Sequence, residues 1–145
     1  MIDFEKLDYS ATKPENMPTE TMEAIAESTS VKTAIIIMEY LGGRIITIPV
    51  KKQTGLYAEL VTVCGVEATD TIFAYFKGQT ISIPVRRSVL PYIISQLSLN
   101  TEMISYLIHA YGVARNTIYN MLKKRPKSYI KNGFKVTLKS IEEFL

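Results

Sequence analysis

Cysteine and histidine are almost missing from this chain, which holds one of each in its 145 residues. A single cysteine excludes an intrachain disulfide, and one cysteine with one histidine cannot make a four-ligand zinc site. A reducing compartment is the natural setting for such a chain. His109 has no carboxylate near it in sequence to orient it as a base, and no phosphate-binding glycine motif is present. We therefore predict no metal, no cofactor, no catalytic residue and no enzymatic activity.

Long apolar runs are also missing. The longest run, from Ala34 to Met38, is far short of the roughly 20 apolar residues that a membrane span needs. The first residues are acidic and lack the apolar core of a signal peptide. We expect a cytoplasmic protein that has no membrane partner. The length fits one compact domain or two very small ones, and a composition of 47% hydrophobic and 21% charged residues predicts that the chain folds.

Acidic residues are absent from a long stretch near the end of the chain. From Met103 to Ile141 the sequence carries eight basic residues and no Asp or Glu, whereas residues 1–30 carry seven acidic residues and two basic ones. The formal net charge of +3 therefore conceals a strong asymmetry. Lysine and arginine set against phosphates release condensed counterions, so the basic stretch fits a surface that binds a polyanion. On charge alone, a solvated basic face is an equal alternative.

An internal repeat relates two stretches that lie 35 residues apart, Tyr40 to Lys52 and Tyr75 to Arg87. Six of their positions are identical, and each copy passes from a helical pattern through a glycine turn into a β-branched segment closed by Ile-Pro-Val. We expect helix, turn and short strand in each copy, with Pro49 and Pro84 at strand ends. Strands this short must pair, either with each other or across a dimer.

Two helices joined by a glycine turn are predicted from Thr101 onward. Ile104, Leu107, Ile108 and Tyr111 make an apolar face at helical spacing, and Gly112 ends that helix. After the turn, a second helix has Ile118, Met121 and Leu122 on its buried side. This pattern is typical of a helix-turn-helix, in which the second helix enters the major groove of DNA. The alternative is an ordinary helical hairpin with an exposed polar face.

The second helix has side chains suited to DNA. Arginine can bind guanine, and asparagine can bind adenine, with two hydrogen bonds. We expect Arg115, Asn116 and Asn120 to contact bases, and Thr117 and Tyr119 to donate to phosphates, with Tyr119 on the outward side. The cationic side chains that add charge just beyond them are Lys123, Lys124 and Arg125.

The stretch ISYLIHAYGVARNTIYNMLKK, Ile104 to Lys124, resembles the helix-turn-helix of the Mor transcription activator family of bacteriophages. The strand from Gly78 to Pro84 is similar to the G-G-x-x-I-x-I-P strand of that family. The resemblance spans about residues 68–124 and implies a dimeric activator, in which helices and strand form the dimerization unit. Two positions depart from the pattern, Ile108 in place of a small alanine and Ala114 in place of the usual serine cap.

The tail after the second helix permits another comparison. Asn132-Gly133 between short β-like segments predicts a hairpin, with a short helix from about Lys139. Together with the preceding helix, the tail resembles excisionase-like winged helix-turn-helix domains. We expect Lys131 and Lys135 to flank the hairpin tip and contact the DNA backbone or minor groove. A C-terminal brace over the two helices is the alternative.

The sequence thus predicts a mainly α fold with short β strands, in three parts. Residues 1–18 form a flexible leader, 19–98 a helical and strand repeat region that serves as core and dimerization unit, and 99–145 a helix-turn-helix domain with a hairpin wing. Double-stranded DNA is the expected partner, bound at a two-fold site by a homodimeric regulator, and RNA polymerase or a recombinase is a candidate further partner. One alternative is an excisionase-like factor that bends DNA for a recombinase. Another is a protein-interaction module or inhibitor that uses the fold as scaffold.

Overall fold

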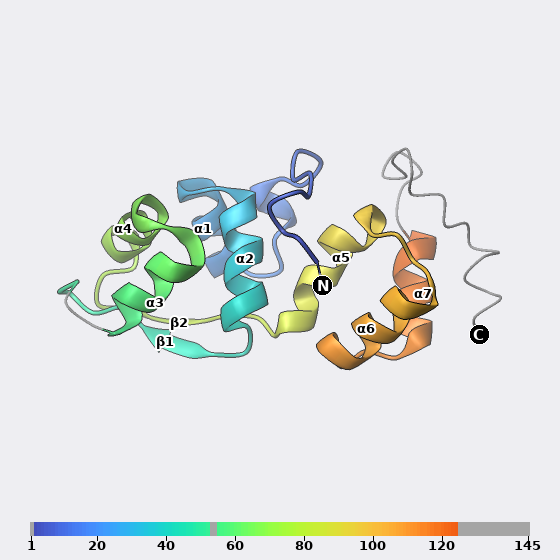
Figure 1. Ribbon diagram of the computed structural model, residues 1–145. Helices are drawn as coiled ribbons and strands as arrows, with labels where there is room; N and C mark the ends of the chain where they lie inside the picture. The colour runs from blue at the N-terminus through green and yellow to red at the C-terminus, as the bar shows by residue number, and fades with distance from the viewer. Residues whose placement is uncertain (1, 53–54, 125–145) are drawn as a thin grey trace. The chain divides into compact units, whose positions relative to one another are not determined.

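The computed structural model describes residues 2–52 and 55–124 and is mainly helical. Within these residues the chain forms seven α-helices and one two-stranded antiparallel sheet (Figure 1). The predicted fold class, mainly α with short strands, is confirmed at this level. The predicted hairpin wing lies outside the described residues.

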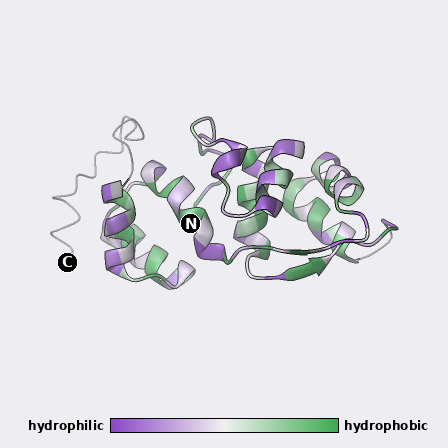
Figure 2. Cartoon of the chain, turned by 180° about the vertical axis from the view of Figure 1, so that it is seen from behind, coloured by the Kyte–Doolittle hydropathy of each residue, from purple (hydrophilic) through white to green (hydrophobic). Residues whose placement is uncertain are grey.

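The chain divides into two compact units, and the division differs from the expected one. The first unit combines Met1–Ala11 with Val89–Leu145, and the second spans Thr12–Ser88. The boundary at Ser88 lies ahead of the one expected at residue 98. In both units the helices carry hydrophilic as well as hydrophobic residues, as Figure 2 shows.

The start of the chain is part of the first unit and not a separate loose leader. Ile2 and Phe4 are buried, although charged residues alternate with them. The side-chain amide of Gln96 pairs with the backbone of Asp8, because the Asp8 N–H donates to Oε1 at 2.6 Å and Nε2 donates to the Asp8 carbonyl at 2.6 Å. The Tyr9 hydroxyl donates to the Phe4 carbonyl, and burial raises the pKa of Tyr9 to about 12. These contacts hold the segment in place.

The second unit contains four helices arranged as two consecutive pairs. They are α1 (Glu20–Ser28), α2 (Val31–Leu41), α3 (Gly55–Cys64) and α4 (Val66–Tyr75). The first pair has side-chain caps: the Thr19 hydroxyl accepts from Met22 N–H, and the Ser30 hydroxyl accepts from Thr33 N–H. Besides the contact within each pair, α2 packs against α3 and α1 packs against α4.

The repeat forms the sheet of this unit within one chain. β1 (Ile45–Thr47) and β2 (Thr80–Ser82) follow the glycine turns of the two copies and pair antiparallel, with Ile46 opposite Ile81. Pro49 and Pro84 lie just beyond the strand ends, where a missing N–H costs no ladder bond. The question of pairing within a chain or across a dimer is therefore answered for these strands: they pair within the chain.

The two copies bury many of the same positions, counted 35 residues apart. Some positions differ: Ile35 and Ile36 are buried, whereas their equivalents Asp70 and Thr71 are only half-buried. The matched buried pairs are Ile25 and Leu60, Ile37 and Ile72, Met38 and Phe73, Leu41 and Phe76, and Ile48 and Ile83. The matched exposed pairs are Tyr40 and Tyr75, and Val50 and Val85. The repeat is thus a repeat of packing as well as of sequence.

The copies differ beside Gly42. A Cβ at this position would lie 2.5 Å from the backbone nitrogen of Arg86, so the close approach admits only glycine. The Arg86 side chain turns onto the carboxylate of Glu39, with Nε at 2.9 Å and Nη2 at 2.6 Å from Oε2. In the other copy, Ala74 occupies the position equivalent to Glu39, and Lys51 occupies the position equivalent to Arg86. This ion pair therefore exists on one side of the unit and has no counterpart on the other.

Candidate nucleic-acid interface

The candidate interface is built on the last two helices of the described chain, α6 (Thr101–Tyr111) and α7 (Arg115–Lys124). They follow the short helix α5 (Leu90–Ile93) in the first unit. Asn100 caps α6, because its side-chain oxygen accepts from the Met103 N–H at 2.7 Å. Sequence reasoning missed this cap, although asparagine directly before an amphipathic segment is an ordinary helix-start signal.

Gly112 ends α6 and turns the chain toward α7. Its φ of 64° lies in the left-handed region, which side chains other than glycine rarely adopt, and its N–H donates to the Ile108 carbonyl at 3.1 Å. Two residues later the Ala114 carbonyl accepts from the Thr117 N–H at 3.0 Å and opens α7. Ala114 has no side-chain oxygen, so α7 begins without a side-chain cap of that kind.

The two helices are joined by apolar packing. Residues of α6, of the turn and of α7 lose almost all of their solvent exposure, and α6 contacts α7 directly. The buried residues are Ile104, Leu107, Tyr111, Val113, Ile118, Tyr119 and Leu122. The predicted burial of Ile118 and Leu122 is observed, whereas Met121 is only half-buried. The core fixes which side of α7 faces outward.

Polar side chains occupy the outward side of α7. Asn116, Asn120 and Lys123 are exposed and follow one another at helical spacing along one stripe, and Arg115 is exposed beside them. Thr117 is half-buried. The structure thus brings four of the predicted contact residues together on one surface of a single helix.

Tyr119 departs from the prediction. We expected it on the outward side as a phosphate donor, but it is 6% exposed and belongs to the core of the unit. The position lies at the border between the two sides of the helix, and a large aromatic ring gains more from burial than from exposure. Lys123 covers the ring, with Nζ 4.0 Å from the ring centroid. Tyr119 therefore acts here as a packing residue that orients Lys123 by a cation–π contact.

The remaining predicted contacts fall at or beyond the end of the described chain. Lys124 is the last residue of α7, and its side chain is not described. Arg125, Lys131 and Lys135 lie outside the described residues. Within residues 103–124 the surface carries basic side chains and no carboxylate, and exposed His109 in the last turn of α6 adds no negative charge. The described cations of this stretch, Arg115 and Lys123, both lie on α7, and the nearest carboxylate in sequence is that of exposed Glu102 in the first turn of α6.

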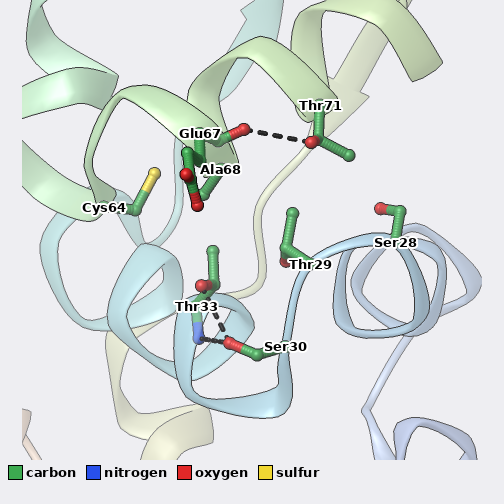
Figure 3. A pocket seen from close by; sticks show the side chains of 8 residues that line it. All are labelled: Ser28, Thr29, Ser30, Thr33, Cys64, Glu67, Ala68 and Thr71. Carbon is green, nitrogen blue, oxygen red and sulfur yellow. Dashed lines mark hydrogen bonds between the residues drawn. The ribbon is translucent and has the colours of Figure 1, made fainter.

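A polar pocket of about 350 Å³ lies in the second unit, between the turn that joins α1 to α2 and the turn that joins α3 to α4 (Figure 3). Two of its hydroxyls donate to backbone carbonyls of their own helices: Ser28 donates to the Ala24 carbonyl, and Thr71 donates to the Glu67 carbonyl. Burial raises the pKa of the Cys64 thiol, which disfavours the reactive thiolate. The pocket therefore offers no activated nucleophile.

Comparisons with protein-family models, with curated proteins and with solved structures find no match for this chain. The described residues contain no helix with the length and apolar character that a membrane span requires. In that same part of the chain, no three His, Cys, Asp or Glu side chains gather closely enough to hold a metal ion.

Proposed function

We propose that the protein is a sequence-specific DNA-binding regulator, of the phage or mobile-element type that the Mor resemblance implies, and that α7 is its recognition helix. The observation that carries the proposal is the stripe of Asn116, Asn120 and Lys123, which faces outward while the opposite side of α7 is fixed against α6. An α-helix fits the major groove, and residues near its N-terminus reach base edges.

Each exposed residue of α7 has a distinct role in this proposal. Arg115 and Asn116 stand in the first turn and bind base edges, and Asn120 extends that contact one turn further. Lys123, held against the Tyr119 ring, binds a phosphate and fixes the register of the helix in the groove. Such a division predicts that the first three residues govern sequence choice and that Lys123 governs affinity for all sequences.

Binding to DNA is tested by measuring affinity for duplexes as salt rises. Affinity should fall steeply between about 50 and 200 mM salt if several phosphates are neutralised. Lys123→Ala should weaken binding to every duplex and reduce the salt slope by about one. Lys77→Ala is the matched control, because Lys77 is also an exposed lysine but belongs to the other unit. Affinity that is absent or independent of salt would rule out the proposed function.

Sequence choice is tested separately with sequences selected from a random pool. Asn116→Ala should reduce discrimination at one or two positions by about 1 to 3 kcal/mol, while affinity for unrelated sequences changes little. Ser105→Ala is the control, because Ser105 is an exposed polar residue of α6 that lies outside the stripe. Equal losses on all sequences would refute base contact by Asn116.

A further inference from the structure

The second unit contains, within one chain, both halves of a two-fold arrangement. Ile81 lies 35 residues after Ile46, and these equivalent residues stand opposite each other in the sheet. The hydrogen bonds beside them repeat in the same way. The Ile48 N–H donates to the Gln79 carbonyl at 2.8 Å, and the Ile83 N–H donates to the Arg44 carbonyl at 2.8 Å. When each residue is replaced by its equivalent 35 positions away, the first hydrogen bond becomes the second.

A second pair of backbone hydrogen bonds is related by the same shift of 35 residues. The Gly78 N–H donates to the Ile48 carbonyl at 2.8 Å, and the Gly43 N–H donates to the Ile83 carbonyl at 3.1 Å. The helix contacts are related in the same way. Helix α3 is equivalent to α1 and α4 to α2, so the contact of α2 with α3 corresponds to the contact of α4 with α1. This is the geometry of an isologous two-fold interface, in which one surface contacts an equivalent copy of itself. Here one chain supplies both copies.

The two copies lead to different helix pairs. After β2 the chain reaches α6 and α7, and the outward surface of α7 carries Arg115 and Lys123, whereas after β1 it reaches α3 and α4. The outward residues of α4 include Glu67 and Asp70, and Asp70 accepts a hydrogen bond from Tyr57 and pairs with Lys52 at 3.1 Å. Carboxylates repel phosphates, so α4 is no substitute for α7 at a DNA surface. The chain thus supplies both strands of the sheet. Among its described helices, only α7 has the surface of a recognition helix.

We propose that a single chain is the DNA-binding species, and that its target is one short, non-palindromic segment contacted by one α7. The proposal rests on the proposed function. A sheet completed by the chain's own second strand needs no strand from another subunit, so the pairing of these strands gives no reason for a homodimer. A monomer presents α7 once, and its DNA target therefore lacks the two-fold symmetry that a dimeric helix-turn-helix protein imposes on its site.

The first experiment tests strand pairing in the full chain. Thr47 and Thr80 stand opposite each other with their hydroxyl oxygens 2.9 Å apart, so cysteines at both positions can form a disulfide. The variant Thr47→Cys/Thr80→Cys is made in a Cys64→Ala background, and the two single variants serve as controls. After oxidation, the double variant should run as a 16.4 kDa monomer on a non-reducing gel and contain no free thiol. Covalent dimers that require both substitutions would overturn the proposal, since they would place the two strands in different chains.

The second experiment measures the mass of the protein and of its complex with DNA. Sedimentation should give one monomer for the free protein and one chain per duplex for the complex, and selected sequences should contain a single motif without an inverted copy. A palindromic motif bound by two chains would overturn the proposal even if the disulfide forms within one chain. A monomer with an internal disulfide that binds no DNA would instead refute the proposed function, and with it the target site, while the self-contained sheet would stand.

Discussion

Removing the Arg86 guanidinium is the most direct test of what holds the two copies of the repeat together. Its Nε and Nη2 atoms lie 2.9 and 2.6 Å from one carboxylate oxygen of Glu39. The Glu39 side chain is 4% exposed and the Arg86 side chain is 40% exposed. In Arg86→Ala the carboxylate stays buried and loses both of these bonds.

The expected cost follows from burial. Removing one partner of a fully buried ion pair costs about 3 to 5 kcal/mol, because the charge that remains is left desolvated. Water reaches the half-exposed guanidinium and weakens the pair, so we expect a loss of about 2 to 3 kcal/mol in the free energy of unfolding. For a unit of this size such a loss lowers the melting temperature by about 10 to 20 °C.

The assay is urea unfolding followed by circular dichroism, with the slope of each transition compared among variants. Lys51→Ala is the matched control, because Lys51 holds the equivalent position in the other copy, is exposed, and has no Glu39 equivalent across from it. We expect it to change the free energy of unfolding by less than about 0.5 kcal/mol. Equal losses for the two variants would refute the reasoning from burial.

A second comparison separates charge from packing. In Glu39→Met/Arg86→Met both charges are replaced by apolar side chains of similar length, so no carboxylate remains in the interior. The double variant should therefore be more stable than Arg86→Met alone. A double variant that is less stable would show that the bonds of the pair outweigh the cost of desolvating it.

Three further predictions follow from single residues. Gly42→Ala should destabilise the second unit by more than about 2 kcal/mol in urea unfolding, because its Cβ would lie 2.5 Å from the Arg86 backbone nitrogen. Tyr119→Phe should leave the dissociation constant for DNA within about twofold, since the buried ring rather than the hydroxyl supports Lys123. Hydrogen bonds from Arg44 lower the pKa of Glu59 in the folded protein. Their contribution to stability is therefore present above the unfolded pKa of Glu59 and is lost as pH falls through the folded pKa. An NMR titration of Glu59 measures the folded pKa.

Each of these predictions has a control. Gly55→Ala should be tolerated, because a Cβ there meets nothing within 4 Å. Asn120→Ala should weaken binding to the preferred sequence while Tyr119→Phe does not; a loss of affinity in the tyrosine variant would restore its hydroxyl as a DNA contact. Arg44→Gln puts the residue of the second copy into the first, and the pKa of Glu59 should then rise toward its ordinary value. An unchanged pKa would show that Arg44 is not the cause.

The helices beside the glycine turns, and the turns themselves, could be predicted because their signals are local. Gly112 after an apolar stripe ends α6 where predicted, and the Ile-Pro-Val segments mark the ends of β1 and β2. The outward position of Asn116, Asn120 and Lys123 followed from helical spacing alone. Tyr119 did not follow from it, since spacing leaves a border position ambiguous and packing decides where a large ring lies.

The burial of the first residues could not be predicted from local signals either. Ile2 and Phe4 stand among charged residues and give no periodic pattern. The segment that contains them is anchored in part by Gln96, which lies 88 residues from its partner Asp8. A contact over such a separation depends on the rest of the unit being folded. The same applies to Glu39, whose partner Arg86 is 47 residues away.

By itself the sequence determined that the chain is mainly helical, that a stretch of it is duplicated, and that its basic charge lies at one end. These properties are set by composition, by local propensity and by periodicity. Only the tertiary structure decided that the two copies pair with each other within one chain, because a three-residue strand meets an equivalent strand equally well in the same chain or in another, and the choice depends on how the intervening helices pack. That choice places the paired strands of both copies in one chain.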